Sequence, residues 1–526
     1  MIPDGAAMLQ VLIPEIILIT GAAVILMTGL GRTPGGSNAA SNIAFMVLGA
    51  ALWWTLTRET TDSAPSLHYD TLVHYTRVVT FGVGFLVLLS CRSVPEAQER
   101  AEFFSLLLFS LAGISLVSLA NDLILLFLAL ELVSVPTYIL IGLSRRDLRA
   151  QEATGKYFFL GAFAAAIMLY GFSFLYGGAG TTQLFAQATG ETSIANYLEL
   201  PSQAADKFII LGLLLSIGGL AFKLAGVPLH FYVADVYQGA ASPVTGMLGF
   251  VPKFAGFLAI IRILSLTGWN FGDGLFWLLW AMASLTMIVG NTLALMQQNV
   301  KRMLAYSSVA HSGYMLVGLV AGPAALGKNT GPLSDGISAL LFYMAIYAVM
   351  NLGAFAAITY FRKPGEDEED SVETLDDLAG AGSRHPWAAL CLAICVLSLM
   401  GMPPTGGFFG KLYVFSAALS AASESPRHGA MIALVVIGVL NSAVAAAYYL
   451  RIVGACYLRP ASDASRRVVA SPCAALKACI AVCSIFVLFV FARPSGLLSK
   501  SRSATAAPES RGVGVSTRAI SAVERP

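Results

Sequence analysis

The chain has 526 residues, of which 57% are hydrophobic and only 12% are charged, and its mean hydropathy is +0.74. Because an ordinary soluble domain is about 25% charged, this composition excludes a water-soluble globular fold. A spanning helix needs about 20 apolar residues, so the chain is long enough for a dozen or more membrane spans. The net charge of +2 gives no indication of nucleic-acid binding.

Windows of apolar sequence predict an all-α polytopic membrane protein with about fourteen transmembrane helices. The first residues, MIPDGAAMLQ, contain an acidic and no basic residue before a long apolar run, so we expect a permanent first helix and no cleaved signal peptide. The predicted spans are 9–30, 43–57, 75–91, 102–119, 122–143, 156–178, 208–238, 243–266, 273–297, 302–321, 335–361, 387–422, 430–458 and 472–492.

Basic residues give an independent test of this count, because lysine and arginine concentrate in the loops on the inner side of a membrane. With the first terminus outside, most basic residues fall in alternate, inner loops, and both termini lie on the outer, periplasmic side of a cell inner membrane. The outer loops then hold few basic residues, namely Arg58, Arg77, Lys207, Lys328 and Arg427.

Glu131 is the first ionisable residue deep within a predicted span, in the run NDLILLFLALELVSVPTYILIGL. A carboxylate at this depth is costly, so it is either protonated or paired. Pro136, five residues later, loosens the backbone hydrogen bonds of the helix. We interpret Glu131 as the ion-pair partner of a buried lysine; the alternative is a polar contact that only joins helices.

Lys223 and Lys253 lie in residues 211–262, which are apolar enough to cross a membrane twice. A lysine at the centre of a membrane helix costs roughly 2.5–3.5 kcal/mol, so two of them indicate a wet, polar track inside the protein. Charges about 4 Å apart attract by roughly 4 kcal/mol at an effective dielectric constant of 20, so opening a pair with Glu131 would change how tightly Lys223 holds a proton. The residues beside these lysines weaken helices: Gly226, Pro228 and Pro252.

His311 lies in KRMLAYSSVAHSGYML, ten residues after Lys301. Histidine is suited to relay protons near neutral pH, although a lone histidine in a helix is often only a core residue. We predict a relay role for His311 after Lys253. Hydroxyl groups that can hold a chain of water molecules surround it in sequence, on Ser307, Ser308, Ser312 and Tyr314.

His230 and Asp235 are weaker candidates near the end of the seventh span. His230 follows Pro228 by two residues, and a proton-relay role for it is less strongly indicated. Asp235 has two open interpretations, which are proton uptake and a salt bridge to a basic residue of an inner loop. The pattern does not decide between them.

Lys411 follows a span interrupted by prolines and glycines, in LMGMPPTGGFFGKLYVF. We predict that it carries protons. The seventh and twelfth predicted spans, five spans apart, each combine a lysine with a break. Paired interrupted segments are typical of transporters built from inverted repeats, so we predict two inverted five-helix repeats with broken helices 7 and 12.

Two further segments and the cysteines are interpreted without a role in transport. Residues 365–377, GEDEEDSVETLDD, are predicted to form a solvated loop, with a docking surface for a partner as the alternative. The polar segment from residue 493 is predicted to be disordered. Seven cysteines lie within or beside apolar runs without a CxxC pair, which favours small buried side chains over metal or cluster ligands.

Taken together, these blocks resemble the antiporter-like subunits of respiratory complex I, the proton-pumping NADH-quinone oxidoreductase, over about residues 100–455. The segment DVYQGAASPVTGMLGFVPKFAGF at 235–257 is most similar to the subunit N family. KRMLAYSSVAHSGYM at 301–315 and GMPPTGGFFGKLYVF at 401–415 resemble motifs of the whole superfamily. A lysine at 411 fits the subunit N family, since the sister subunit M is expected to have glutamate there.

The resemblance implies roles for the residues singled out above. Glu131 and Lys223 would be the gating ion pair, Lys253 and His311 the central relay, and Lys411 the outlet toward the periplasm. Two departures from the family pattern lie near the inner end of helix 7, where the route of proton uptake would run. The family often has Trp-Thr-Pro-Asp where this chain has YVAD at 232–235, and often has proline where this chain has Ala241.

The same resemblance implies an organisation and partners. Residues 1–100 would form flanking helices 1–3, 101–266 the first antiporter-like half, 267–458 the second half, and 459–526 the last helix and a polar tail. Other membrane subunits of complex I would be the partners. FMN, iron–sulfur clusters and quinone would belong to other subunits, with no cofactor and no metal in this chain.

Two competing functions are kept open. A subunit of a multisubunit sodium/proton antiporter shares the superfamily, but the 235–257 block and the absence of an obvious extra carboxylate for sodium argue against it. The other alternative is a structural membrane spacer whose lysines serve only assembly. The chain has no GxGxxG dinucleotide fingerprint, so we expect its own chemistry to be proton transfer.

Overall fold

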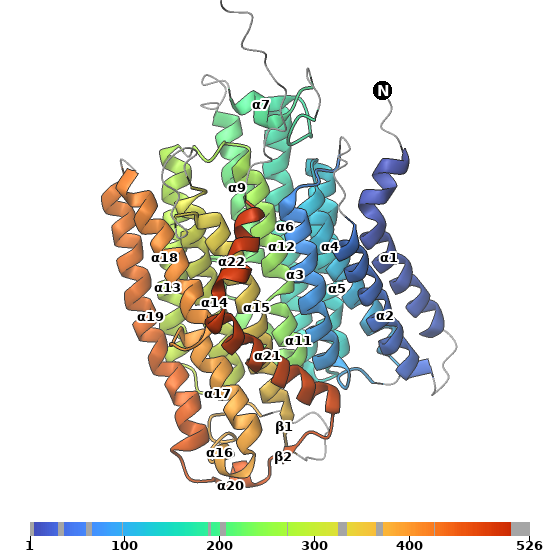
Figure 1. Ribbon diagram of the computed structural model, residues 1–526, viewed down its shortest axis with the longest axis vertical. Helices are drawn as coiled ribbons and strands as arrows, with labels where there is room; N and C mark the ends of the chain where they lie inside the picture. Colours follow the sequence, from blue (N-terminus) through green and yellow to red (C-terminus); the bar gives the residue numbers. More distant parts are fainter. Residues whose placement is uncertain are drawn as a thin grey trace, which may run out of the picture.

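A computed structural model gives the structure of the protein. It describes residues 5–29, 36–58, 66–96, 98–187, 191–199, 207–270, 272–324, 334–363, 372–424 and 427–505. These residues are mostly helical, and the long helices stand side by side in one bundle (Figure 1). The all-α membrane fold predicted from the sequence is confirmed.

Helices occupy all fourteen predicted spans. In the described residues, twelve spans are long and apolar enough to cross a membrane, and the eighth of the fourteen is made of two adjoining helices. The seventh and twelfth are each divided into two helices by a break. The first six spans are α1 (Gly5–Gly29), α2 (Gly36–Thr57), α3 (Thr71–Cys91), α4 (Arg100–Leu119), α5 (Leu123–Ser144) and α6 (Leu148–Ala179). The next two are α9 (Lys207–Lys223) with α10 (Val233–Gly239), and α11 (Ser242–Leu248) with α12 (Val251–Ser265). The last six are α13 (Asp273–Leu295), α14 (Val300–Ala321), α15 (Gly336–Tyr360), α17 (Pro386–Met400) with α18 (Gly406–Glu424), α19 (His428–Tyr457) and α21 (Ala474–Ala492).

Short elements close the two ends of the bundle. The helix α7 (Ile194–Leu198) lies at one end (Figure 1). At the other end, α16 (Ala381–Arg384) and α20 (Asp463–Arg466) lie near a two-stranded antiparallel sheet. This sheet pairs β1 (Phe361–Arg362) with β2 (Val469–Ala470), so it ties the segment after α15 to the segment before α21.

Local sequence explains where several helices start and stop. Asp122 and Asp335 cap α5 and α15, because their side chains accept hydrogen bonds from backbone N–H groups of the first turn. The break after α9 contains Pro228, which cannot donate a backbone hydrogen bond. The break after α17 begins at Gly401, whose φ of 86° is readily adopted only by glycine.

The centre of the bundle is formed by α11, α12, α14 and α15, which are buried almost throughout. In contrast, α1, α2, α6, α19 and α21 leave more than half of their apolar windows exposed, as expected for helices that face lipid or other subunits. All the central helices carry polar residues on buried faces. A polar path can therefore run through the middle of an otherwise apolar protein.

Two predictions about basic residues were wrong. Arg77 was placed in an outer loop, but it is buried in α3 and forms an ion pair of 2.8 Å with Glu15 of α1. Lys301, one residue before the predicted span 302–321 and so expected in an inner loop, lies in the first turn of α14 and is fully buried. In both cases the residue type gives no sign of burial, because a basic residue near the edge of an apolar run can lie either in a loop or within the helix.

Two predictions about polar segments were also wrong in part. Residues 494–503, expected to be disordered, form helix α22 (Pro494–Ser503), which packs against α15 and α3. The acidic segment was expected to be solvated; residues 365–371 lie outside the described part, but Asp377 is buried and forms an ion pair of 2.6 Å with Lys363. Of the seven cysteines, six are buried as expected and Cys473 is partly buried.

Candidate functional site

The predicted pair of Glu131 and Lys223 is formed. Helices α5 and α9 bring the Lys223 Nζ to 3.4 Å from the Glu131 Oε1, and Lys223 also donates a hydrogen bond to the Ser134 hydroxyl. The Lys223 side chain is almost fully buried, whereas a quarter of the Glu131 side chain is exposed. Lys223 is the last residue of α9, so its amine stands at the point where the helix breaks.

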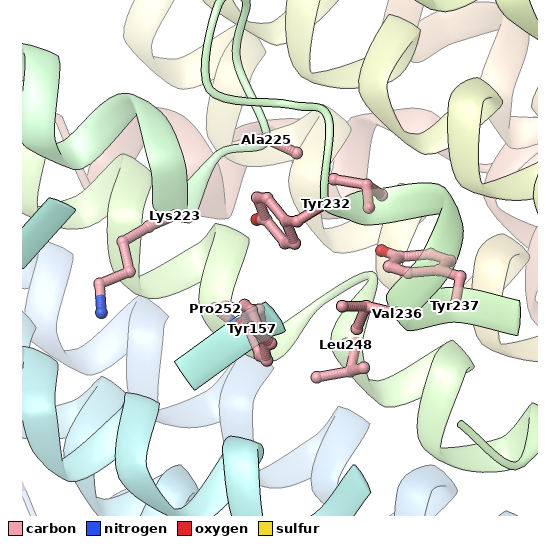
Figure 2. A pocket seen from close by; sticks show the side chains of 9 residues that line it. Tyr157, Lys223, Ala225, Tyr232, Val236, Tyr237, Leu248 and Pro252 are labelled. Atoms are coloured by element: carbon pink, nitrogen blue, oxygen red, sulfur yellow. The ribbon is translucent and has the colours of Figure 1, made fainter. Parts of the chain in front are cut away.

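A small cavity lies beside Lys223. Its volume is about 10 Å³, which is close to the minimum that holds one water molecule. Figure 2 shows the ammonium end of Lys223 directed away from the tyrosine rings that form the other walls. The cavity walls are mostly apolar, and two of the tyrosine hydroxyls form hydrogen bonds, Tyr232 to the Phe222 carbonyl and Tyr237 with Ser308. Those rings belong to Tyr157, Tyr232 and Tyr237.

Tyr237 connects this cavity to the second buried lysine. Its hydroxyl lies 3.1 Å from the Ser308 Oγ, which also accepts a hydrogen bond of 2.5 Å from the Lys253 Nζ. The Tyr347 hydroxyl donates to the same Ser308 oxygen at 2.8 Å. Lys253 is almost fully buried and forms no ion pair in the described part of the chain. Ser308 is therefore the junction of three polar side chains at the bundle centre.

His311 lies one helical turn beyond Ser308 on α14 and is buried. Its two ring nitrogens contact two tyrosine hydroxyls, Nδ1 to Tyr343 at 2.7 Å and Nε2 to Tyr449 at 2.9 Å. In a neutral imidazole one nitrogen donates and the other accepts. Each tyrosine hydroxyl can either donate or accept a hydrogen bond, so a proton can enter at one nitrogen and leave from the other.

Lys411 of α18 is buried near the second break. Its Nζ donates hydrogen bonds to the Met400 carbonyl at 2.8 Å and to the Ser442 hydroxyl at 2.9 Å. It also lies 4.7 Å from the centre of the Tyr314 ring, at cation–π distance. The Met400 carbonyl is available because α17 ends there. Thus the break supplies a ligand for the amine, as interrupted membrane helices commonly do.

The two weaker candidates are not part of this path. Asp235 of α10 forms ion pairs of 2.8 Å with Lys156 and with Arg302, which fits the salt-bridge interpretation of the two left open. His230 is partly buried within the break between α9 and α10. In the described structure it forms no hydrogen bond with any of the other predicted site residues. The structure thus brings together five of the seven predicted residues in one connected region.

Sequence reasoning missed most of the neutral members of this region. Serine and tyrosine are common in membrane helices, so their residue types alone do not mark them as functional. Only their contacts with the ionisable residues or with Ser308 do so, and those contacts join helices far apart in the sequence. The missed residues are Ser134, Tyr237, Tyr343, Tyr347, Ser442 and Tyr449. In the described residues, no cluster of histidine, cysteine and acidic side chains suitable for a metal ion occurs.

Comparison with known sequences identifies relatives along most of the chain. The family model described as "NADH:quinone oxidoreductase/Mrp antiporter, TM" matches residues 120–442. A protein of Trichlorobacter lovleyi named NADH-quinone oxidoreductase subunit N is 36% identical over 468 residues, which cover 86% of this chain and 88% of that protein. The protein of the same name from Myxococcus xanthus is 34% identical over 509 residues, or 92% of this chain and 95% of the relative.

Comparison with solved structures gives the same fold. A chain of respiratory complex I from Thermus thermophilus matches with a TM-score of 0.73 and 28% identity, covering 92% of this chain and 98% of that one. A chain of the Mrp complex from Dietzia sp. matches with a TM-score of 0.76 over 93% of this chain and 96% of that one. At 22% identity, the second match shows a shared fold alone.

Proposed function

The chain belongs to the NADH:quinone oxidoreductase/Mrp antiporter membrane family, among the subunit N relatives, and we propose that its buried ionisable residues form the route of the protons. It is a proton-translocating membrane subunit of an NADH-quinone oxidoreductase and sits with other membrane subunits. The alternative of a sodium/proton antiporter subunit is not favoured, because the Mrp match is the more distant one.

The proposed route has four steps. Glu131 and Lys223 open and close as a pair; the water-sized cavity and Tyr237 carry the proton toward Ser308 and Lys253; His311 relays it; and Lys411 releases it. The observation that carries this proposal is the buried contact of 3.4 Å between Lys223 and Glu131. An amine almost without solvent, beside one carboxylate, changes its proton affinity strongly when that carboxylate moves.

The proposed energetics require a driving force from outside the chain. Moving one charge against 100 mV requires about 2.3 kcal/mol. We propose that this comes from electron transfer between NADH and quinone, with FMN and iron–sulfur clusters, in other subunits of the complex. The proton-carrying chain itself is expected to bind no cofactor.

The proposed arrangement in the membrane follows from the two breaks. Residues 101–266 and 267–458 are proposed as two inverted halves, flanked by 1–100 and 459–526. In support, the first helix of each half packs against the last, α4 on α12 and α13 on α19. The broken span is the fourth of five in each half. We also propose that both termini of this inner-membrane protein face the periplasm.

Replacement of Lys223 by alanine tests the proposed function. In inside-out membrane vesicles that contain the whole complex, NADH-driven proton uptake, followed with a pH-sensitive dye, is expected to be lost while assembly is retained. The control is Lys477→Ala, because Lys477 is exposed on α21 and should leave both unchanged. Normal pumping by the Lys223→Ala variant would contradict the route, and failed assembly would support the structural-spacer alternative.

A further inference from the structure

Helix α10 is a short element on which the proposed route depends. It has seven residues and lies between the break after α9 and a turn at residues 240–241. An isolated helix of this length is not stable by itself, so contacts with other elements must hold it in place. It carries Tyr237, whose ring lines the cavity beside Lys223 and whose hydroxyl contacts Ser308.

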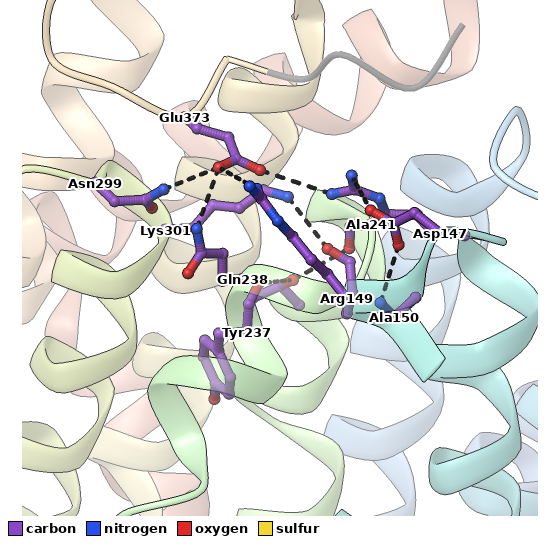
Figure 3. A network of polar contacts seen from close by, with 12 residues as sticks. Asp147, Arg149, Ala150, Tyr237, Gln238, Ala241, Asn299, Lys301 and Glu373 are labelled. Atoms are coloured by element: carbon purple, nitrogen blue, oxygen red, sulfur yellow. Dashed lines mark hydrogen bonds and ion pairs between the residues drawn. The ribbon is translucent and has the colours of Figure 1, made fainter. Parts of the chain in front are cut away.

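Glu373 fastens α10 to two other parts of the protein. Its carboxylate accepts hydrogen bonds from Gln238 of α10 at 3.3 Å and from Asn299, the N-cap of α14, at 3.0 Å. The same carboxylate lies 3.7 Å from Arg145 and 3.8 Å from Arg149, near the start of α6 (Figure 3). Only 19% of the Glu373 side chain is exposed, so these contacts are poorly screened by solvent.

Glu373 is itself held firmly. Its carbonyl accepts a hydrogen bond of 2.7 Å from the Val300 N–H, at the first residue of α14. Its N–H donates to the Asp377 carboxylate, which is paired with Lys363. Burial alone would raise the pKa of Asp377, but hydrogen bonds from Lys363 and Thr374 outweigh the effect of burial and lower that pKa. The Asp377 carboxylate that holds Glu373 is therefore charged at neutral pH.

The charge of Glu373 also balances a local excess of cations. Lys301 is fully buried at the start of α14, and its Nζ donates to the Ala240 carbonyl at 3.2 Å, directly after α10. The charged groups that act on Lys301 are the cations Arg145 and Arg149 and the acids Glu373 and Asp147. Without the Glu373 charge, Asp147, which is paired with Arg145 at 2.7 Å, would be left as the acid that balances these three cations.

We propose that Glu373 is a positioning residue for proton transfer: it fixes α10 so that Tyr237 bridges the cavity beside Lys223 and the Ser308–Lys253 contact. This inference rests on the proposed function, because it assigns Glu373 a task within that route. Glu373 touches none of the proton carriers named in that route; its carboxylate holds α10 through Gln238 and the start of α14 through Asn299.

The test combines backbone dynamics with transport in the intact complex. In Glu373→Ala, hydrogen–deuterium exchange of residues 233–241 is expected to be about tenfold faster, as follows from losing charge-assisted hydrogen bonds. Proton uptake should fall severalfold, and Glu373→Gln should lie between this variant and the parent. The matched control is Asp376→Ala, on the same loop, because Asp376 is exposed and its carboxylate pairs with Arg459.

A double substitution separates positioning from general damage. If Glu373 acts through Tyr237, adding Glu373→Ala to Tyr237→Phe should lower transport little further. The proposal would be overturned if hydrogen–deuterium exchange at 233–241 were unchanged in Glu373→Ala. It would also be overturned if the transport loss of the double variant equalled the product of the losses of the two single variants. Failure of both Glu373 variants to assemble, with Asp376→Ala assembled, would also overturn it in favour of a purely structural role. If Lys223→Ala still pumps, the proposed function fails, while the exchange measurement still decides whether Glu373 fixes α10.

Discussion

The four residues proposed to carry protons after Glu131 each have a different set of partners. Lys223 has a carboxylate, Lys253 has a serine shared with two tyrosines, His311 has two tyrosine hydroxyls, and Lys411 has a freed carbonyl and a serine. Only the first site is an ion pair within the described residues. At Lys253, His311 and Lys411, charge is therefore stabilised mainly by hydroxyl and carbonyl dipoles. A proton can be bound and released there without separating an ion pair.

His311 gives the residue-scale prediction. Phenylalanine keeps the ring volume but cannot exchange a proton between Tyr343 and Tyr449, so His311→Phe should reduce NADH-driven proton uptake by about 100-fold. The level of assembled complex is the control, because the buried site tolerates an aromatic ring. Tyr343→Phe, which removes one of the two hydroxyl contacts, should give a smaller loss. Pumping at the parental rate by His311→Phe would show that the histidine is only a core residue.

At the scale of elements, the Lys223 site depends on how closely α6 packs against α9. A Cβ atom at Gly171 of α6 would lie 2.5 Å from the Ser216 backbone nitrogen and 2.8 Å from the Gly212 carbonyl oxygen. The two backbones are thus in direct contact, as is typical where small residues join membrane helices. This crossing sets the direction in which α9 presents Lys223 to Glu131.

A larger residue at this crossing should displace α9. Gly171→Val should destabilise the protein by about 1–3 kcal/mol through overpacking, and it should lower proton transport by moving Lys223 away from Glu131. The matched control on the same helix is Gly177→Val, since no heavy atom lies within 4 Å of the corresponding Cβ position. The midpoint of thermal unfolding and proton uptake would be measured for both. Equal unfolding midpoints and equal proton uptake in the two variants would show that α6 and α9 do not pack closely at Gly171.

Sequence patterns predicted the long elements well, for a physical reason that does not extend to their contacts. A run of about 20 apolar residues in a membrane must satisfy its own backbone hydrogen bonds, which favours a helix. The positions of the spans could therefore be predicted from the sequence. The partners of Lys223 and His311 could not, because Ser134 and Tyr449 come from distant helices and carry no pattern of their own. The helical segment at 494–503 was missed because its composition is polar, although it packs on α15.

For the whole molecule, we propose a polar path along the buried helices α12 and α14, with Glu131 and Lys411 toward its two ends. The structure brings the ionisable residues between them within reach of hydroxyl groups, and the small cavity beside Lys223 offers room for about one water molecule. Proton transfer over such a path requires bridging water molecules wherever side chains do not touch.

A structure of the intact complex, at a resolution that shows ordered water, tests this central claim most directly. We predict water density in the cavity beside Lys223 and between His311 and Lys411, so that an unbroken series of hydrogen bonds connects Glu131 to Lys411. Dry packing that separates Lys223 from Ser308, or His311 from Lys411, in every state of the working complex would contradict it.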